Sequence, residues 1–237
     1  MLSSLQSEKK RRELNEKLIK YTLILAAAIS ILTTFGILFS ILFEAIEFFQ
    51  LRSFWYFLTG TIWSPGVANS QFGALPIFAG TFVITIIALL VAIPIGLGSA
   101  IYMSEYASPK FRDYLKPILE ILAGIPTVVY GFFAAITVAP LVVKAAAFFG
   151  LEATFNSALA SGIVMGIMII PLISSLSDDV IRAVPDSQRK AAFALGMTHG
   201  ETIKNIVIPS AMPGIISASL LALSRALGET MIVVMAA

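Results

Sequence analysis

Residues 76–103 read PIFAGTFVITIIALLVAIPIGLGSAIYM and contain no charged side chain. A helix needs about 20 mostly apolar residues to cross the hydrocarbon core of a membrane, and this stretch exceeds that length. A helix also satisfies its own backbone polar groups, which an open strand in lipid cannot do. The stretch therefore predicts a membrane-spanning helix and places the chain among integral membrane proteins.

The composition of the whole chain agrees with this interpretation. Of the 237 residues, 58% are hydrophobic and 13% are charged, and the mean hydropathy is +0.92. Soluble domains carry about 25% charged residues, so one water-soluble core cannot hide this much apolar surface. We expect an all-α membrane protein with five spans, at residues 21–43, 76–103, 119–143, 156–177 and 206–237, the last interrupted by Arg225 and Glu229.

The small residues of Gly162-x-x-x-Gly166 permit close contact between two helices, although a single such pair is a weak signal. We divide the chain into four parts. The parts are a cytoplasmic N-terminal segment (1–20), a first transmembrane helix (21–43), an external loop with interfacial aromatic residues (44–75), and a core (76–237) that contains a cytoplasmic loop at 178–205.

Lys and Arg are distributed unevenly between alternate loops. The N-terminal segment, the 104–117 loop and the 178–205 loop hold all 16 of them except Arg52, Lys144 and Arg225. Basic residues concentrate in cytoplasmic loops, so the N-terminus is expected in the cytoplasm.

The sequence lacks the residues that several kinds of binding site and catalytic site require. The chain has one histidine and no cysteine, which leaves no cluster of metal ligands and no thiolate. It has no Gly-Lys dipeptide, so it lacks a phosphate-cradling loop with its lysine. We therefore expect no catalytic residue, no metal, no cofactor and no nucleic-acid partner. We interpret the neighbouring carboxylates of Asp178 and Asp179 as solvated charges at the end of a span.

The loop between the fourth and fifth spans predicts a short helix. Residues 185–196 read PDSQRKAAFALG, in which QRKAAFAL favours two to three helical turns and Gly196 is a stop signal. Ala191, Ala192 and Ala194 make its surface small, so another protein could approach closely. A plain surface connector fits these residues equally well.

The spacing of Ala191, Ala192 and Gly196, followed by Ile208 and Pro209, resembles the EAA loop of bacterial ABC-importer permeases. Over residues 55–231 the chain also resembles the phosphate permeases of the PstC type. This resemblance is carried by FLTGTIWSP (57–65), FGALPIFAGT (72–81), IPIGLGSAIYMSEYASP (93–109), GIPTVVYGF (124–132) and RALGET (225–230).

The resemblance implies a MetI-like type I ABC importer permease bundle, of which five spans are visible and the sixth is apparently missing. It implies a transport subunit, not an enzyme, in a bacterial or archaeal cell (inner) membrane. The implied substrate is inorganic phosphate. The implied partners are membrane lipid, a second permease subunit of the PstA type, a cytoplasmic ATPase dimer of the PstB type and an extracytoplasmic phosphate-binding protein of the PstS type. In this family the loop is a coupling helix that docks on the ATPase, which assigns ATPase coupling to Lys190, Ala191, Ala192 and Gly196, with Lys190 where the loop usually has Glu.

The stretch SRALGET (224–230) places Arg225 and Glu229 four residues apart. If the last span ends at Ser224, Arg225 lies at the outer surface. If a single helix runs from about Gly214 to Ala237, which Pro213 and the apolar tail favour, Arg225 lies near mid-membrane. Charged residues there normally face an aqueous pathway or a bundle interior.

A guanidinium offers paired donors to a phosphate oxyanion, so with the resemblance we expect Arg225 and Glu229 to line the substrate pathway. A structural ion pair between helices is the competing interpretation. The alternatives for the whole chain are a permease for molybdate, tungstate or sulfate, a proton-coupled carrier using Arg225 and Glu229, and a membrane-embedded phosphate sensor.

Overall fold

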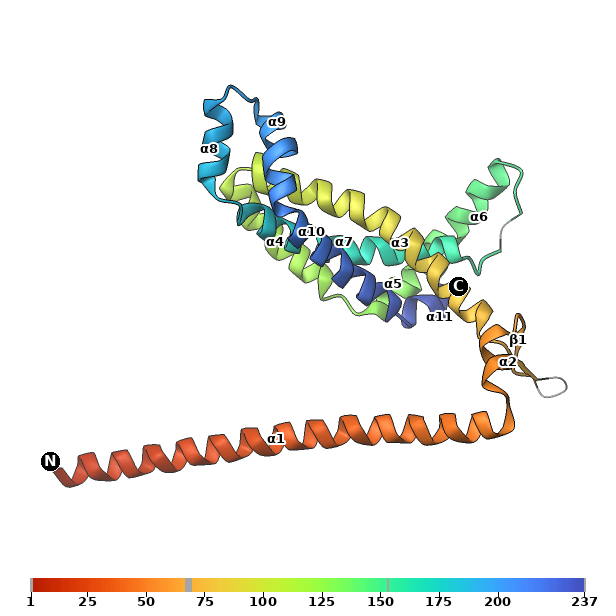
Figure 1. Cartoon of the computed structure of the whole chain (residues 1–237), viewed down its shortest axis with the longest axis horizontal. Helices are drawn as coiled ribbons and strands as arrows, with labels where there is room; N and C mark the ends of the chain where they lie inside the picture. Colours follow the sequence, from red (N-terminus) through yellow and green to blue (C-terminus); the bar gives the residue numbers. More distant parts are fainter. Residues whose placement is uncertain (1, 67–69, 153, 237) are drawn as a thin grey trace. The chain divides into compact units, whose positions relative to one another are not determined.

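The computed structural model describes residues 2–66, 70–152 and 154–236, and it separates into one unit up to Leu75 and a second unit from Pro76 onward. The secondary structure is almost entirely helical (Figure 1). The elements of the first unit are α1 (Leu2–Leu51), α2 (Phe54–Thr59), β1 (Trp63–Ser64) and β2 (Gln71–Phe72). The second unit contains α3 (Leu75–Ile101), which starts at the boundary, the π-helical turn η1 (Tyr102–Tyr106), α4 (Pro109–Ala123), α5 (Thr127–Phe133), η2 (Ala134–Val138), α6 (Ala139–Phe148), α7 (Ala158–Arg182), α8 (Asp186–Ala194), α9 (His199–Thr202), η3 (Ile203–Val207), α10 (Ile208–Leu227) and α11 (Met231–Ala236).

The first unit joins one long helix to a small aromatic cluster. Helix α1 runs without a break through the expected first span and on to Leu51. The strands β1 and β2 pair antiparallel, with Trp63 opposite Phe72. The ring of Phe48 packs edge-on against Phe57 and Phe72, at centroid distances of 5.7 and 5.6 Å. The aromatic residues of this segment therefore contact one another and the end of α1.

Five helical runs in the described residues are long and apolar enough to cross a membrane, as expected: Asn15–Leu51, Leu75–Tyr106, Thr127–Phe148, Ala158–Arg182 and His199–Leu227. The third run begins at Thr127, so the expected start at 119 is wrong. Helix α4 ends at Ala123 with Gly124 as its cap, and Pro126 has extended backbone before α5 begins. Proline lacks a backbone N–H and disfavours helical backbone in the residue before it, so the Gly-Ile-Pro segment separates the two helices. The segment carries no charge, so charge alone does not reveal this break.

Helix α7 is the centre of the second unit. The buried cluster around it draws residues from α3, η2, α7, α10 and α11: Ile84, Ala88, Ala92, Ala134, Val164, Met165, Met168, Ile169, Ile173, Ala222, Ala226, Ile232 and Ala236. A second buried cluster joins the ends of α3 and α7 to η3 and α10: Ala100, Ile181, Val184, Val207, Ala211 and Ile215. The second cluster lies next to the loop helix α8.

Small residues let α3 and α7 pack closely. A Cβ atom built on Gly162 would lie 2.7 Å from Ile87 Cβ, and one on Gly166 would lie 2.8 Å from the carbonyl oxygen of Ala88. The predicted close helix contact at this glycine pair is therefore confirmed. Ser99 of α3 and Ser174 of α7 add a hydrogen bond of 2.6 Å between their hydroxyl groups.

Candidate functional site: the loop helix and its polar contacts

Helix α8 is the short helix that the sequence predicts between the fourth and fifth spans. Its end has the geometry of a glycine cap: the N–H of Gly196 donates to the carbonyl oxygen of Phe193 (3.0 Å), and the N–H of Met197 to that of Ala192 (3.2 Å). Gly196 has φ +81°, a left-handed conformation that side-chain-bearing residues rarely adopt. The stop signal at Gly196 is confirmed.

The face of α8 that looks toward the start of α10 forms a groove of about 560 Å³. The groove is mostly apolar in character, with Ala191, Ala192, Leu195 and Pro209 among its walls. Ala191 is exposed and Ala192 is buried, and both line the groove. Lys190 is exposed on the same helix, and Gly196 follows the helix between Leu195 and Met197, which both line the groove. The four residues assigned to coupling thus lie on one short segment.

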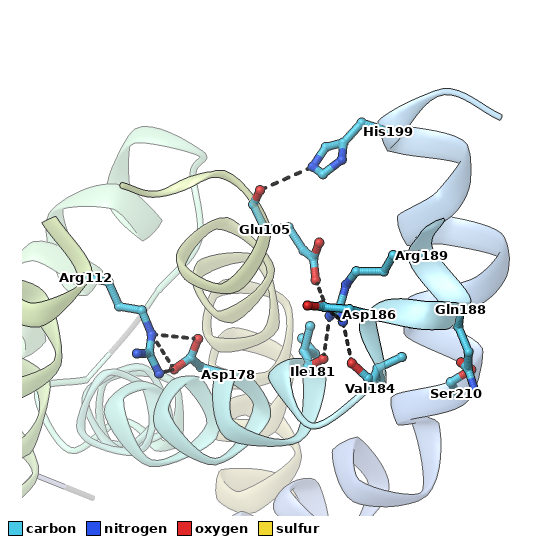
Figure 2. A network of polar contacts seen from close by, with 10 residues as sticks. All are labelled: Glu105, Arg112, Asp178, Ile181, Val184, Asp186, Gln188, Arg189, His199 and Ser210. Atoms are coloured by element: carbon cyan, nitrogen blue, oxygen red, sulfur yellow. Dashed lines mark hydrogen bonds and ion pairs between the residues drawn. The ribbon is translucent and has the colours of Figure 1, made fainter. Parts of the chain in front are cut away.

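Arg189 connects α8 to two other elements (Figure 2). Its Nη2 donates to Glu105 Oε1 (2.8 Å) and to the carbonyl oxygen of Ile181 (2.9 Å). Its Nη1 donates to the carbonyl oxygen of Val184 and lies 3.5 Å from a carboxylate oxygen of Asp186. The Arg189 and Glu105 side chains are only 15% and 6% exposed, so this ion pair is largely removed from water.

Glu105 is also contacted from the other side of the loop. The Nε2 atom of His199, at the start of α9, lies 3.2 Å from the Glu105 carbonyl oxygen. The His199 ring is edge-on to Tyr106 at 5.1 Å and stacks on Phe193 of α8 at 6.1 Å. Turn η1, at the end of α3, is therefore in contact with both α8 and α9.

A second ion pair ties α4 to the end of α7. Arg112 Nη2 donates to Asp178 Oδ2 (2.6 Å), and Arg112 Nε donates to the same oxygen (3.1 Å). The hydrogen bond to Asp178 raises the pKa of Arg112, and the nearby carboxylates reinforce this against the opposing effect of burial. The Asp178 side chain is fully buried, so its interpretation as a solvated charge is wrong, whereas Asp179 is 53% exposed and pairs with Lys116 at 2.5 Å.

Arg225 and Glu229 are not on one helix, so the expectation of a single helix from Gly214 to Ala237 is wrong. Helix α10 ends at Leu227 with Gly228 as its cap, and α11 begins at Met231. Arg225 is exposed in the last turn of α10, where a cation is favoured by the helix dipole.

Glu229 instead caps the backbone at the start of α11. Its Oε1 accepts hydrogen bonds from the backbone N–H groups of Met231 (3.1 Å) and Ile232 (3.4 Å). None of the ion pairs in the described part of the chain joins Arg225 to Glu229.

Reasoning from the sequence missed the polar contacts behind α8. From the sequence alone, Arg112 and Arg189 are only loop charges that set the orientation, and Glu105 has no assigned role. Glu105 and Arg189 are separated by 84 positions in the chain, so no local spacing could reveal their contact. The one available signal was an acidic residue directly after a long apolar run.

Residues 92–237 match the model of a protein family described as "Binding-protein-dependent transport system inner membrane component". The chain is 38% identical over 179 residues to the "Probable ABC transporter permease protein YqgH" of Bacillus subtilis, covering 76% of this chain and 57% of the relative. It is 34% identical to the "Phosphate transport system permease protein PstC 1" of Mycobacterium tuberculosis, covering 76% of this chain and 62% of the relative. It is 35% identical to the "Phosphate transport system permease protein PstC" of Mesorhizobium japonicum, covering 88% of this chain and 68% of the relative.

Among solved structures, a MetNI methionine ABC transporter in an inward-facing conformation is similar, with a TM-score of 0.46 and 19% identity over 66% of this chain and 68% of that chain. The chain thus spans 57% and 62% of the length of its relatives from Bacillus subtilis and Mycobacterium tuberculosis.

Proposed function

Because the chain belongs to the family of binding-protein-dependent transport system inner membrane components, we propose that it is a permease subunit of an ATP-driven importer for inorganic phosphate. In this proposal it forms the translocation pathway with a second permease subunit of the PstA type. ATP is hydrolysed in a separate cytoplasmic ATPase dimer of the PstB type. An extracytoplasmic phosphate-binding protein of the PstS type delivers the substrate.

The observation that carries the proposal is the arrangement of α8. It is a short helix between two apolar spans, with exposed small residues beside a groove and a largely buried arginine that binds it to the ends of α3 and α7. A helix held in this way can receive force from another protein and pass it to the spans. The identity of the proposed substrate comes from the names of the relatives, several of which are phosphate transport system permeases.

The proposed orientation places the N-terminus and α8 in the cytoplasm, because the basic residues cluster in the corresponding loops. The aromatic cluster around Phe48, Phe57 and Phe72 then lies on the outer side, where aromatic residues commonly sit at the membrane interface. The ATPase meets α8 from inside, and the binding protein meets the chain from outside.

We assign Arg225 to the substrate pathway. It is an exposed cation within the last turn of an apolar helix, and a guanidinium can present two N–H groups to one phosphate. Glu229 lies just past the helix end, and its negative charge would keep the attraction weak enough for release. The proton-coupled alternative uses the same two residues, but it gives no role to α8 or its groove.

The test is reconstitution of the full chain with its second permease subunit, ATPase and binding protein in vesicles. We expect ATP-dependent uptake of radiolabelled phosphate and ATP hydrolysis that rises when loaded binding protein is present. Stronger competition by molybdate, tungstate or sulfate than by unlabelled phosphate would assign the importer to that oxyanion. Uptake driven by a pH gradient without the ATPase would favour the proton-coupled carrier, and phosphate binding without flux would favour the sensor.

A further inference from the structure

Helix α8 is held to the rest of its unit mainly by polar contacts. Among its nine residues only Ala192 is buried, so apolar packing holds it weakly. On its α10 side, Ser210 donates a hydrogen bond to Gln188 (3.1 Å) at an exposed position. The largely buried contact is the one that Arg189 makes with Glu105 and with the end of α7.

Arg189 meets several acceptors that lie on different parts of the chain. The carbonyl oxygens of Ile181 and Val184 belong to the C-terminal end of α7 and the turn that follows, where the helix dipole favours a cation. The carboxylate of Glu105 belongs to η1, at the end of α3. A planar guanidinium can serve these acceptors at once, whereas a lysine ammonium is a compact point charge.

Glu105 completes the connection to the far side of the loop. Its carboxylate contacts α8 through Arg189, and its carbonyl oxygen contacts His199 of α9. The ring of His199 in turn stacks on Phe193 of α8. Helix α8, η1 and α9 therefore form a closed set of contacts around one acidic residue, next to the buried cluster that joins α3, α7 and α10.

We propose that Glu105 and Arg189 are positioning residues, a clasp through which displacement of α8 reaches α3 and α7. The proposal rests on the proposed function, because it assumes that an ATPase displaces α8. Neither residue is assigned to substrate contact or to ATPase contact. When the contact between Glu105 and Arg189 is broken, a displacement of α8 no longer displaces α3 and α7. Less phosphate is then transported for each ATP that is hydrolysed.

The variants Glu105→Gln and Arg189→Lys test this in the reconstituted complex. Gln keeps the size of the side chain and removes its charge, and Lys keeps the charge but cannot serve the carbonyls and the carboxylate together. We expect phosphate moved per ATP hydrolysed to fall about tenfold, equivalent to about 1.4 kcal/mol of lost coupling, while the ATPase still co-purifies. Lys116→Gln is the matched control, because it removes a more exposed ion pair that does not involve α8.

A covalent replacement separates coupling from folding. The natural chain has no cysteine, so Glu105→Cys with Arg189→Cys introduces a unique pair of thiols. Joining them with a reducible bifunctional methanethiosulfonate linker should restore phosphate moved per ATP, and a reductant should abolish the restoration in the same sample.

The outcomes distinguish the clasp from the proposed function. A wild-type complex without ATP-dependent phosphate uptake would reject the function itself. A working wild type with unchanged coupling in both single variants would overturn the clasp alone. Loss of ATPase co-purification in both single variants, or a linker that changes nothing, would show that the pair only supports folding and would also overturn the clasp.

Discussion

Arg225 and Glu229 lie on opposite sides of a helix break, although they are four positions apart in an apolar stretch. Arg225 occupies the last turn of α10, and Glu229 directs its carboxylate to the backbone N–H of Met231 at the start of α11. Gly228 ends α10 between them. The break leaves the guanidinium exposed and gives the carboxylate a local role, so the two side chains can be tested separately.

Replacing Arg225 by Ala should lower phosphate uptake at least tenfold with little change in the amount of protein in the membrane. A charge-assisted hydrogen bond contributes about 1.5–3 kcal/mol, which is the loss that removal of the guanidinium would cause. Arg225→Lys should give an intermediate rate, because it keeps the charge without the paired donors. Uptake would be measured in vesicles, with Lys144→Ala as the control at another exposed cation in an apolar helix. Equal uptake by wild type and Arg225→Ala would remove Arg225 from the pathway.

Glu229→Gln should lower both the KM for phosphate and the maximal uptake rate. The amide oxygen can still accept from the N–H of Met231, so α11 keeps its cap while the negative charge near Arg225 is lost. Without that charge the anion is held more tightly and released more slowly. Glu229→Ala removes the acceptor as well and should also destabilise the start of α11 by about 1 kcal/mol. If Gln and Ala give the same transport kinetics, the charge of Glu229 has no part in release.

The sequence predicted the spans well because a long uncharged apolar run is compatible with few structures besides a membrane helix. It placed the third span eight residues too early, since charge alone does not show the turn at Gly124 and Pro126. It also extended the last helix past Gly228, although a glycine beside a polar pair is itself a stop signal. Local signals for helix ends therefore existed in both places.

The polar contacts behind α8 were beyond prediction from one sequence. Arg112 and Asp178 are 66 positions apart, and each looks like a loop charge when read alone. Only folding shows that Asp178 is fully buried and that Arg189 points away from solvent. Gly196 was predictable because the left-handed helix cap depends on local backbone geometry, which the residue type reveals directly.

The Arg112–Asp178 pair leads to a prediction about stability. Asp178→Ala leaves the largely buried guanidinium of Arg112 with only the Asp179 carboxylate, 3.9 Å away, and should destabilise the protein by about 3 kcal/mol. This is the low end for a broken buried pair, because Arg112 keeps that neighbour and some contact with water. Asp179→Ala removes the partly exposed pair with Lys116 and this longer contact, and it should cost about 0–1 kcal/mol. Thermal unfolding in detergent would measure both. Equal losses at the two positions would mean that Asp178 is not buried against Arg112.

The contact between α3 and α7 gives a prediction about packing. Gly166→Ala puts a methyl group 2.8 Å from the carbonyl oxygen of Ala88, which is backbone and cannot rotate away. The helices must separate, and overpacking of this kind costs about 1–3 kcal/mol. Gly98→Ala is the control, because its Cβ would meet nothing within 4 Å. The lower melting temperature should appear only for Gly166→Ala, and a lowered value for Gly98→Ala alone would contradict the packing described.

Gly196 provides the sharpest test of the loop helix. Its φ of +81° means that Gly196→Val strains the backbone, although no atom lies near the position that its Cβ would occupy. Left-handed backbone at such a residue costs about 1–3 kcal/mol, which α8 can relieve by unwinding its last turn and distorting the groove edge. We expect the ATPase to bind less well and phosphate uptake to fall, with the spans still folded. Gly200→Ala, at an open position without positive φ, serves as the control. Because the backbone alone causes the strain, α8 must change shape in Gly196→Val. Full uptake by this variant would therefore show that transport does not depend on the shape of α8.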